Sequence, residues 1–228
     1  IASKVVAQAK VQLSGISKSL STSYALPELI NAKGVFIYDI ESDPDKKEDF
    51  LHGFLTLKRN TNGSWDIRKA KYIPLLMLTI DGERKCWEAI SKKINASKNW
   101  PILHYGETES LCLSQIAKRH GLSDKDLKYL QGRLIDIHAR LRSNWLLPLS
   151  SYGLKSVASW LGFRWTQKRV DGAQALLWWR QYKVCYAQNK GRKNDLRWIF
   201  EYNRDDTIAT WTVAEWLIKK DIEEKQAS

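Results

Sequence analysis

The stretch Gly34-Val35-Phe36-Ile37-Tyr38-Asp39-Ile40-Glu41 is an almost unbroken β-prone apolar run that ends in acidic residues. Such a run is typical of a strand that is buried on both faces. Turn-forming residues follow at 42–47, and a second strand is expected at 50–57. The sequence Asn60-Thr61-Asn62-Gly63 favours a hairpin that leads into a third strand near 64–73. We therefore expect three antiparallel strands at the start of the folded region.

The rest of the chain shows mainly the helical spacing of apolar residues. A short strand is expected at 101–105, between a helix over about 81–95 and a helix from about 107 to 120. Further helices are expected at about 123–131, 135–145, 153–161, 172–188 and 194–220. This order of elements predicts an α/β fold with a mixed sheet flanked by helices.

The composition is that of a basic globular protein. Hydrophobic residues make up 43% and charged residues 27% of the 228 residues, which excludes wholesale disorder. No apolar run approaches the roughly 20 residues that span a bilayer, so an integral membrane protein is not expected. Lys and Arg number 37 against 25 Asp and Glu, and the net charge of +12 favours binding to the phosphate backbone of nucleic acids.

The cysteines indicate the cellular setting. Cys86, Cys112 and Cys185 lie far apart and form no Cys-x-x-Cys pair. Their odd number and their spacing argue against a disulfide scaffold or a zinc ribbon. We therefore expect a reducing, intracellular setting, most simply the cytoplasm.

The N-terminal sequence bears on domain organisation. The chain starts at Ile1 without an initiator Met or a signal peptide, so we read it as a piece of a longer polypeptide. Residues 1–32 are expected to be a lead-in, either a linker or the end of a preceding domain. The folded domain is expected at 33–222, followed by a short tail at 223–228.

Two carboxylates close the first strand. Asp39 and Glu41 are two residues apart, so their side chains point to the same face of the sheet. Adjacent carboxylates repel each other unless a cation neutralises them, and hard divalent ions such as Mg²⁺ prefer oxygen ligands. An Asp-x-Glu triplet is common by itself, and a solvated turn is the alternative interpretation.

A second acidic feature lies in the expected C-terminal helix. Tyr202 and Asp206 are four residues apart, so both project from one face of that helix. The apolar periodicity around them puts the carboxylate on the buried side, where it needs a partner. The alternative is that Asp206 pairs with a basic residue while Tyr202 only packs.

Together, these motifs resemble those of the DEDD exonucleases of the RNase H-like superfamily, in the subgroup that contains Tyr. In that group an Asp-x-Glu motif on the first strand is joined by a middle acid and by a Tyr-x-x-x-Asp motif on a C-terminal helix. More closely, the chain resembles the C-terminal module of predicted RecB-family nucleases over about residues 33–220. The resemblance rests on five stretches, which are Tyr38-Asp39-Ile40-Glu41, His104-Tyr105-Gly106-Glu107-Thr108-Glu109, Ile135-Asp136-Ile137-His138, Leu147-Pro148-Leu149-Ser150-Ser151-Tyr152-Gly153-Leu154-Lys155 and Glu201-Tyr202-Asn203-Arg204-Asp205-Asp206.

The resemblance implies an RNase H-like fold with a mixed five-stranded sheet and a site for two Mg²⁺ or Mn²⁺ ions. It implies that Asp39 bridges the ions and that Glu41 and Asp206 complete the more tightly held site. Glu109 would act mainly through water. Tyr202 would orient the attacking water by hydrogen bonding.

Several polar residues around these motifs have alternative roles. The group usually has Asp as its middle acid; here Glu109 stands at that position, with Glu107 as the alternative. Asp136 is expected either to support the metal ligands from behind or to cap a helix. His104 is expected to orient a ligand or to be structural, and Asp205 is an alternative to the last acid of the motif.

The activity that the resemblance implies is hydrolysis of phosphodiester bonds, with removal of nucleotides from the 3′ ends of single-stranded DNA or RNA. One alternative is a catalytically inactive module that binds nucleic acid or positions other domains of a larger RecB-like nuclease or helicase protein. Another is an enzyme that cuts at structured junctions or inside a strand. Neighbouring domains and a role in DNA repair are expected on the same ground. The nucleic-acid backbone is expected to contact a set of basic residues, with an ordinary solvated surface as the alternative: Lys155, Arg164, Lys168, Arg169, Lys190, Arg192 and Lys193.

Overall fold

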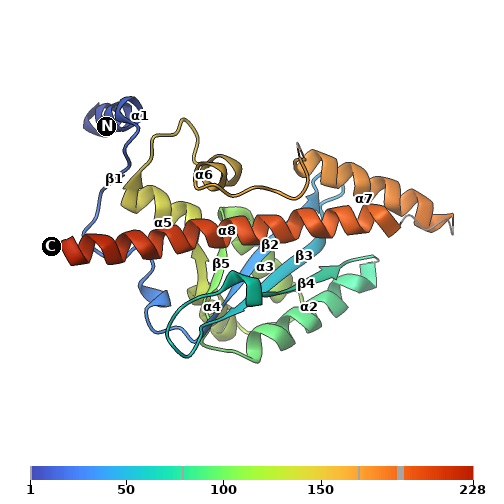
Figure 1. The fold of residues 1–228 in the computed structure, drawn as a ribbon. Coiled ribbons are helices and arrows are strands. Elements are labelled where there is room, and N and C mark those ends of the chain that lie inside the picture. The colour runs from blue at the N-terminus through green and yellow to red at the C-terminus, as the bar shows by residue number, and fades with distance from the viewer. Residues whose placement is uncertain (1, 79, 169, 189–192, 228) are drawn as a thin grey trace.

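A five-stranded mixed sheet forms the centre of the chain (Figure 1). The computed structural model describes residues 2–78, 80–168, 170–188 and 193–227. The strand order is β4-β3-β2-β5-β6, with β2 (Gly34–Asp43), β3 (Glu48–Lys58), β4 (Lys71–Leu76), β5 (Ile102–His104) and β6 (Leu134–Asp136). The β2–β3 and β3–β4 pairs are antiparallel, whereas the β2–β5 and β5–β6 pairs are parallel. The expected α/β fold with a mixed five-stranded sheet is confirmed.

Helices cover both faces of this sheet. One face carries Phe36 and Tyr38 of β2, which pack against α2 (Ile80–Asn95), α3 (Glu107–Arg119) and α4 (Asp124–Arg133). The other face carries Val35 and Ile37, which pack against α5 (Ile137–Asn144), α6 (Leu154–Trp160) and α8 (Lys193–Ala227). Figure 1 shows α8 crossing the sheet as one long helix. Because side chains alternate along a strand, Asp39 continues the row of Val35 and Ile37 toward α8.

The far ends of β2 and β3 are covered by α7 (Gly172–Ala187). The ring of Trp179 in α7 stacks on Phe50, with ring centroids 4.6 Å apart and planes 10° apart. Arg180 in the same helix donates two hydrogen bonds to the fully buried Asp43, at 2.9 and 2.6 Å. The apolar contact and the ion pair together fix α7 at the end of the sheet where β2 carries its acidic residues.

The N-terminal residues pack against β7 and α8. They form α1 (Ala2–Ser14), β1 (Lys18–Ser19) and a 3₁₀ turn, η1 (Pro27–Leu29). Strand β1 pairs in antiparallel fashion with β7 (Trp145–Leu146). The backbone N–H of Ala25 donates to the carboxylate of Asp221 in α8 at 2.9 Å.

Three elements differ from their expected bounds. The helix expected at 135–145 begins at Ile137, because residues 134–136 form β6. β4 begins at Lys71 rather than near 64, because Asp66 caps a 3₁₀ turn, η2 (Ile67–Lys69), by accepting from the N–H of Arg68. α8 continues to Ala227, past the expected end near 220, and its last turns carry ion pairs at helical spacing, such as Lys219–Glu215. In the described parts of the chain, none of the helices combines the length and apolarity needed to span a bilayer.

Candidate metal centre

Three carboxylates meet where β2 faces α8. Asp39 and Glu41 come from β2 and Asp206 from α8, and one oxygen atom of each lies within 4.8 Å of the other two. Glu41 is 7% and Asp206 9% exposed. The fold thus brings together acids that are more than 160 residues apart in the sequence, as the family resemblance implies.

The electrostatics of this group favour a bound cation. Burial raises the pKa of Asp39 and of Glu41 well above the usual range, and the charge of Asp206 raises both further. Burial also raises the pKa of Asp206 to about 6, although hydrogen bonding from Trp165 and the charge of Lys155 act in the opposite direction. Neighbouring buried carboxylates repel one another when ionised, and a bound divalent cation removes this repulsion. Carboxylate oxygens are also the hard donors that divalent ions prefer. The donor set therefore fits Mg²⁺ or Mn²⁺.

A buried amide bridges two of the acids. The Nδ2 group of Asn203, which is fully buried, donates to Asp39 at 2.7 Å and to Glu41 at 3.3 Å. The hydroxyl of Tyr72 donates to the Oδ1 atom of Asn203 at 2.8 Å, and this fixes which end of the amide faces the acids. Gly53 lies opposite Asp39 on β3, and a Cβ atom there would fall 1.7 Å from Asn203 Oδ1. The amide therefore occupies space that only a glycine leaves open.

Asp206 has its own set of partners. The indole N–H of Trp165 donates to Asp206 at 2.6 Å, and the hydroxyl of Tyr202 also hydrogen-bonds to it. The Nζ atom of Lys155 lies 5.1 Å from the centroid of the Tyr202 ring and donates to the carbonyl of Val170. Lys155, which we expected to contact nucleic acid, thus lies half-buried beside the acidic group.

The middle acid lies at the start of α3. Glu109 is 9% exposed, and burial raises its pKa to about 7. Its Oε2 atom is buried and has no hydrogen-bond partner among the described residues. Glu107 is exposed, so Glu109 is the acid of this motif that faces inward. Glu109 is not, however, one of the three acids whose oxygens lie within 4.8 Å of one another.

Asp136 and His104 hold the turn that precedes α3. The Oδ1 atom of Asp136 accepts from the backbone N–H of His138 at 2.9 Å and caps α5, which is the helix-capping alternative. The same oxygen accepts from the N–H of Gly106 at 3.0 Å. His104 is buried, and its Nδ1 atom lies 2.7 Å from the carbonyl of Gly106. Both side chains therefore shape the loop that presents Glu109.

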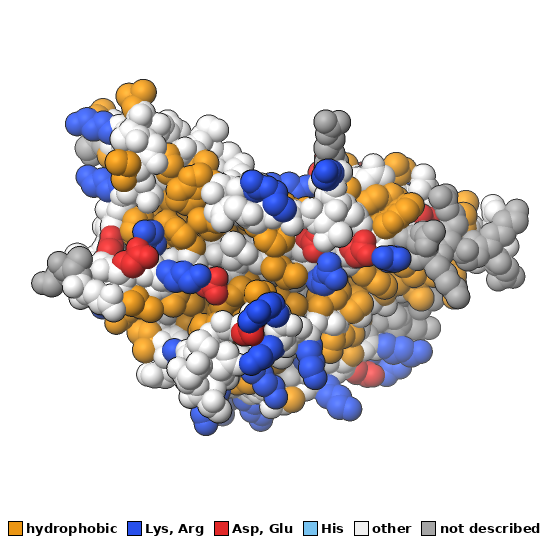
Figure 2. Space-filling model, viewed as in Figure 1, with side chains coloured by type: hydrophobic (Ala, Val, Ile, Leu, Met, Phe, Trp, Pro, Cys, Tyr) orange, Lys and Arg blue, Asp and Glu red, His pale blue; other side chains and the backbone are white. Residues whose placement is uncertain are grey.

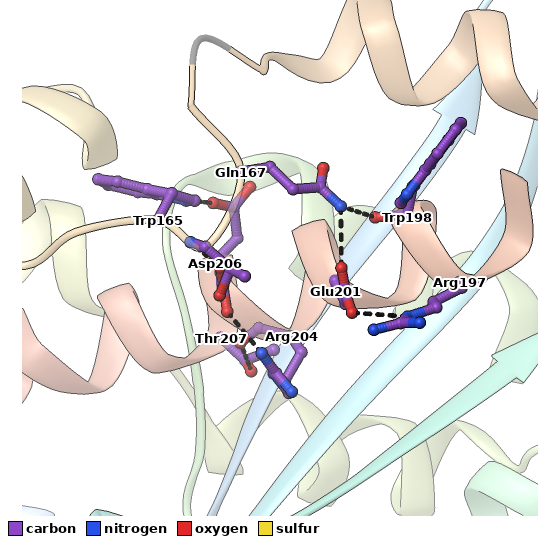
Figure 3. A network of polar contacts seen from close by, with 10 residues as sticks. Trp165, Gln167, Arg197, Trp198, Glu201, Arg204, Asp206 and Thr207 are labelled. Atoms are coloured by element: carbon purple, nitrogen blue, oxygen red, sulfur yellow. Dashed lines mark hydrogen bonds and ion pairs between the residues drawn. The ribbon is translucent and has the colours of Figure 1, made fainter. Parts of the chain in front are cut away.

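Asp205 takes part in a different contact. It accepts a hydrogen bond from the backbone N–H of Thr166 at 2.6 Å, and Arg204 pairs with it at 3.2 Å. One turn earlier in α8, Gln167 donates to Glu201 at 3.2 Å (Figure 3). The loop between α6 and α7 is thus anchored along α8, and Asp205 secures it rather than joining the group of three acids.

The remaining basic residues lie at varied positions. Arg164 and Lys168 are exposed, and Arg164 donates to the carbonyls of Ser159 and Phe163. Figure 2 shows Lys and Arg spread over this face of the molecule rather than gathered in one patch. Three of the predicted residues, Arg169, Lys190 and Arg192, lie outside the described residues, and so does the side chain of Lys193.

Sequence reasoning missed Asn203 and Trp165. Asn203 is three residues before Asp206, so helical spacing puts both on the sheet side of α8. Gly53 in the middle of an expected strand is a signal for close approach of another group. The two signals mark Asn203 and Gly53 as candidates, but neither shows that the two residues meet. Trp165 has no comparable local signal, because its contact depends on how a loop folds back onto α8.

Comparison with known proteins supports the assignment of the fold. A family model described as the RNase_H superfamily matches residues 36–218, which include the acids of β2, α3 and α8. No curated protein and no solved structure gave a significant match. The match covers most of the chain, and the chain therefore belongs to the RNase_H superfamily.

Proposed function

We propose that this chain is a metal-dependent nuclease that removes nucleotides from the 3′ ends of single-stranded DNA or RNA, in the manner of the DEDD exonucleases with Tyr. The observation that carries the proposal is the buried convergence of Asp39, Glu41 and Asp206, with oxygens within 4.8 Å of one another. Membership of the RNase_H superfamily is consistent with a nuclease. The net charge of +12 suits a polyanionic substrate.

The acids of the site would hold two divalent ions. When bound, Mg²⁺ or Mn²⁺ supplies charge neutralisation for the attacking and leaving oxygens and makes a bound water more acidic. Asp39, Glu41 and Asp206 would be the ligands in this proposal. Glu109, which is not one of these three acids, would contribute through water, as the family resemblance implies.

Tyr202 and Lys155 act on the acids and on water. Burial and the charge of Asp206 raise the pKa of Tyr202 above its usual range, so the phenol stays protonated at neutral pH. Its hydroxyl therefore orients the attacking water and does not serve as the base. The positive charge of Lys155 lowers the pKa of both Glu41 and Asp206, which favours the ionised forms that bind a cation.

The alternative is a module that binds nucleic acid without cutting it. The observation that favours it is that Glu109 is not one of the acids whose oxygens lie within 4.8 Å of one another. In that case the fold positions other domains of a longer protein on nucleic acid. A test of cation binding together with cleavage separates the two functions.

The test uses single strands of DNA and of RNA labelled at the 5′ end, with Mn²⁺ present. Wild-type protein is expected to shorten both or one of them from the 3′ end. Asp206→Asn is expected to lose at least about 100-fold in rate, in the range for loss of a group that acts on the transition state. Glu107→Gln is the matched control, because Glu107 is exposed on the same helix as Glu109.

Wild-type protein that binds Mn²⁺ but leaves every labelled strand intact would establish the non-cutting module instead. A product ladder that starts from internal positions would replace the exonuclease by an endonuclease. Equal rates for Asp206→Asn and wild type would contradict the assigned site.

A further inference from the structure

A cleft of about 790 Å³ lies between α1 and the segment that connects α5 to α6. Figure 1 shows this segment rising from α5 toward α1 before it descends into α6. Side-chain amides hold α1 over the cleft. Gln8 donates to the carbonyl of Leu147 and Gln12 to that of Leu149, both at 2.8 Å. The hydroxyl of Tyr152 donates to Gln8 Oε1 at 3.0 Å.

The charged side chains that line this cleft are positive. Among the described residues that line it there is no Asp or Glu, whereas Lys4, Arg142 and His138 are present. Neither Lys4 nor Arg142 forms an ion pair within the described ranges, and both are exposed. The adjoining sequence continues the pattern, because residues 1–27 include three Lys and no acidic residue. Unpaired cations in a concave wall concentrate anions.

The cleft adjoins the proposed active site. Tyr152 and Gly153 line it, and Lys155, two residues further on, lies 5.1 Å from the ring centroid of Tyr202. On the other side, the hydroxyl of Tyr105 donates to the carbonyl of Tyr152. Tyr105 precedes the turn that presents Glu109. The segment 152–155 is therefore a wall common to the cleft and the acidic group.

We propose that this cleft binds the sugar–phosphate backbone of a single nucleic-acid strand whose end lies at the acidic group. The inference rests on the proposed function and adds the path of the nucleic-acid strand over the protein surface. A volume of about 790 Å³ is within the range of pockets that hold compact ligands, so it has room for a short stretch of one strand. Lys4 and Arg142 neutralise phosphates, while the hydroxyls of Ser150 and Ser151 are further donors.

The test is the salt dependence of binding, measured with fluorescein-labelled oligothymidylate in EDTA, where no cleavage occurs. The double variant Lys4→Ala/Arg142→Ala removes two phosphate contacts. For a single strand each contact accounts for roughly 0.7 in the slope of log affinity against log salt, so the slope becomes about 1.4 less steep. At 0.1 M salt this corresponds to roughly 25-fold weaker binding. Arg142→Glu reverses one charge and is expected to weaken binding more than Arg142→Ala alone.

The matched control is Lys118→Ala/Lys128→Ala, which removes the same charge from exposed positions on α3 and α4. Unchanged affinity and slope in the cleft variant, or equal losses in cleft and control variants, would overturn the inference. A second assay measures hydrolysis of a dinucleotide and of a twelve-nucleotide strand with Mn²⁺. The cleft variant should raise KM for the longer strand only. If wild-type protein cuts neither substrate while the binding results hold, the cleft assignment stands and the proposed nuclease activity fails.

Discussion

Gly53→Ala should damage the metal centre without altering any acid. Gly53 lies opposite Asp39 on β3, and an added Cβ would lie 1.7 Å from Asn203 Oδ1 and 3.1 Å from the Tyr72 ring. Asn203 must therefore move, and its hydrogen bonds to Asp39 and Glu41, at 2.7 and 3.3 Å, are lost.

The magnitude follows from the bonds that are lost. A hydrogen bond to a charged group contributes about 1.5–3 kcal/mol, and overpacking a core costs about 1–3 kcal/mol. With one such hydrogen bond and the overpacking counted, we expect the free energy of unfolding of the metal-free protein to fall by about 2.5–6 kcal/mol. Groups that orient metal ligands change metal affinity by roughly 10- to 100-fold, so Mn²⁺ affinity should weaken by that factor.

Urea unfolding in EDTA and calorimetric titration with Mn²⁺ measure the two quantities. Gly132→Ala is the control, because Gly132 lies in α4 with nothing within 4 Å of an added Cβ and should tolerate the change or gain stability. In Gly53→Ala/Asn203→Ala the clash is removed, so part of the stability should return while Mn²⁺ affinity stays low. Wild-type stability and Mn²⁺ affinity in Gly53→Ala would refute the bridging role of Asn203.

Three further outcomes follow from the same contacts. Trp165→Phe removes the indole donor to Asp206 and should weaken Mn²⁺ binding about tenfold, with an unchanged circular dichroism spectrum; unaltered titration curves would show that the 2.6 Å contact is dispensable. Tyr202→Phe should lower kcat by about 100-fold or more, while Mn²⁺ binding weakens only about tenfold because the hydroxyl also hydrogen-bonds to Asp206; a loss of Mn²⁺ affinity as large as the loss of kcat would contradict its role in orienting water. Without metal, the folded protein binds protons more tightly than the unfolded chain, since burial raises the pKa of Asp206 to about 6 and that of Glu109 to about 7. In EDTA, the contribution of these two groups to stability should therefore be greatest below about pH 4 to 4.5, and it should be lost as the pH rises through 6 to 7. An unfolding midpoint that increases with pH over this window would argue against a cluster of buried acids without a bound cation.

Much of the fold could be predicted from local patterns. The run at 34–41 is the central strand, and its period of two places Asp39 and Glu41 on one face. The spacing of four between Tyr202 and Asp206 is enough to put both on the same side of a helix. Such patterns are local, so they can be recognised in the sequence without knowledge of the tertiary structure.

The contacts that complete the site depend on packing between distant elements. Asn203 reaches Asp39 because Gly53 on a neighbouring strand leaves room for its amide. The contact of Lys155 with nucleic acid stays a prediction, and its place beside Tyr202 depends on the packing of α6 against α8. The start of β4 was misplaced because the capping of η2 by Asp66 competes with strand pairing.

The most direct test of the central claim is the position of Mn²⁺ in crystals of the full chain, located by anomalous scattering. The acids of β2 and α8 should carry the strongest peak, with Asp39, Glu41 and Asp206 as ligands. The same crystals of Asp39→Asn should lose this peak while the fold is retained. A strongest peak elsewhere, or no peak at this group in wild-type crystals at millimolar Mn²⁺, would contradict the proposed metal centre.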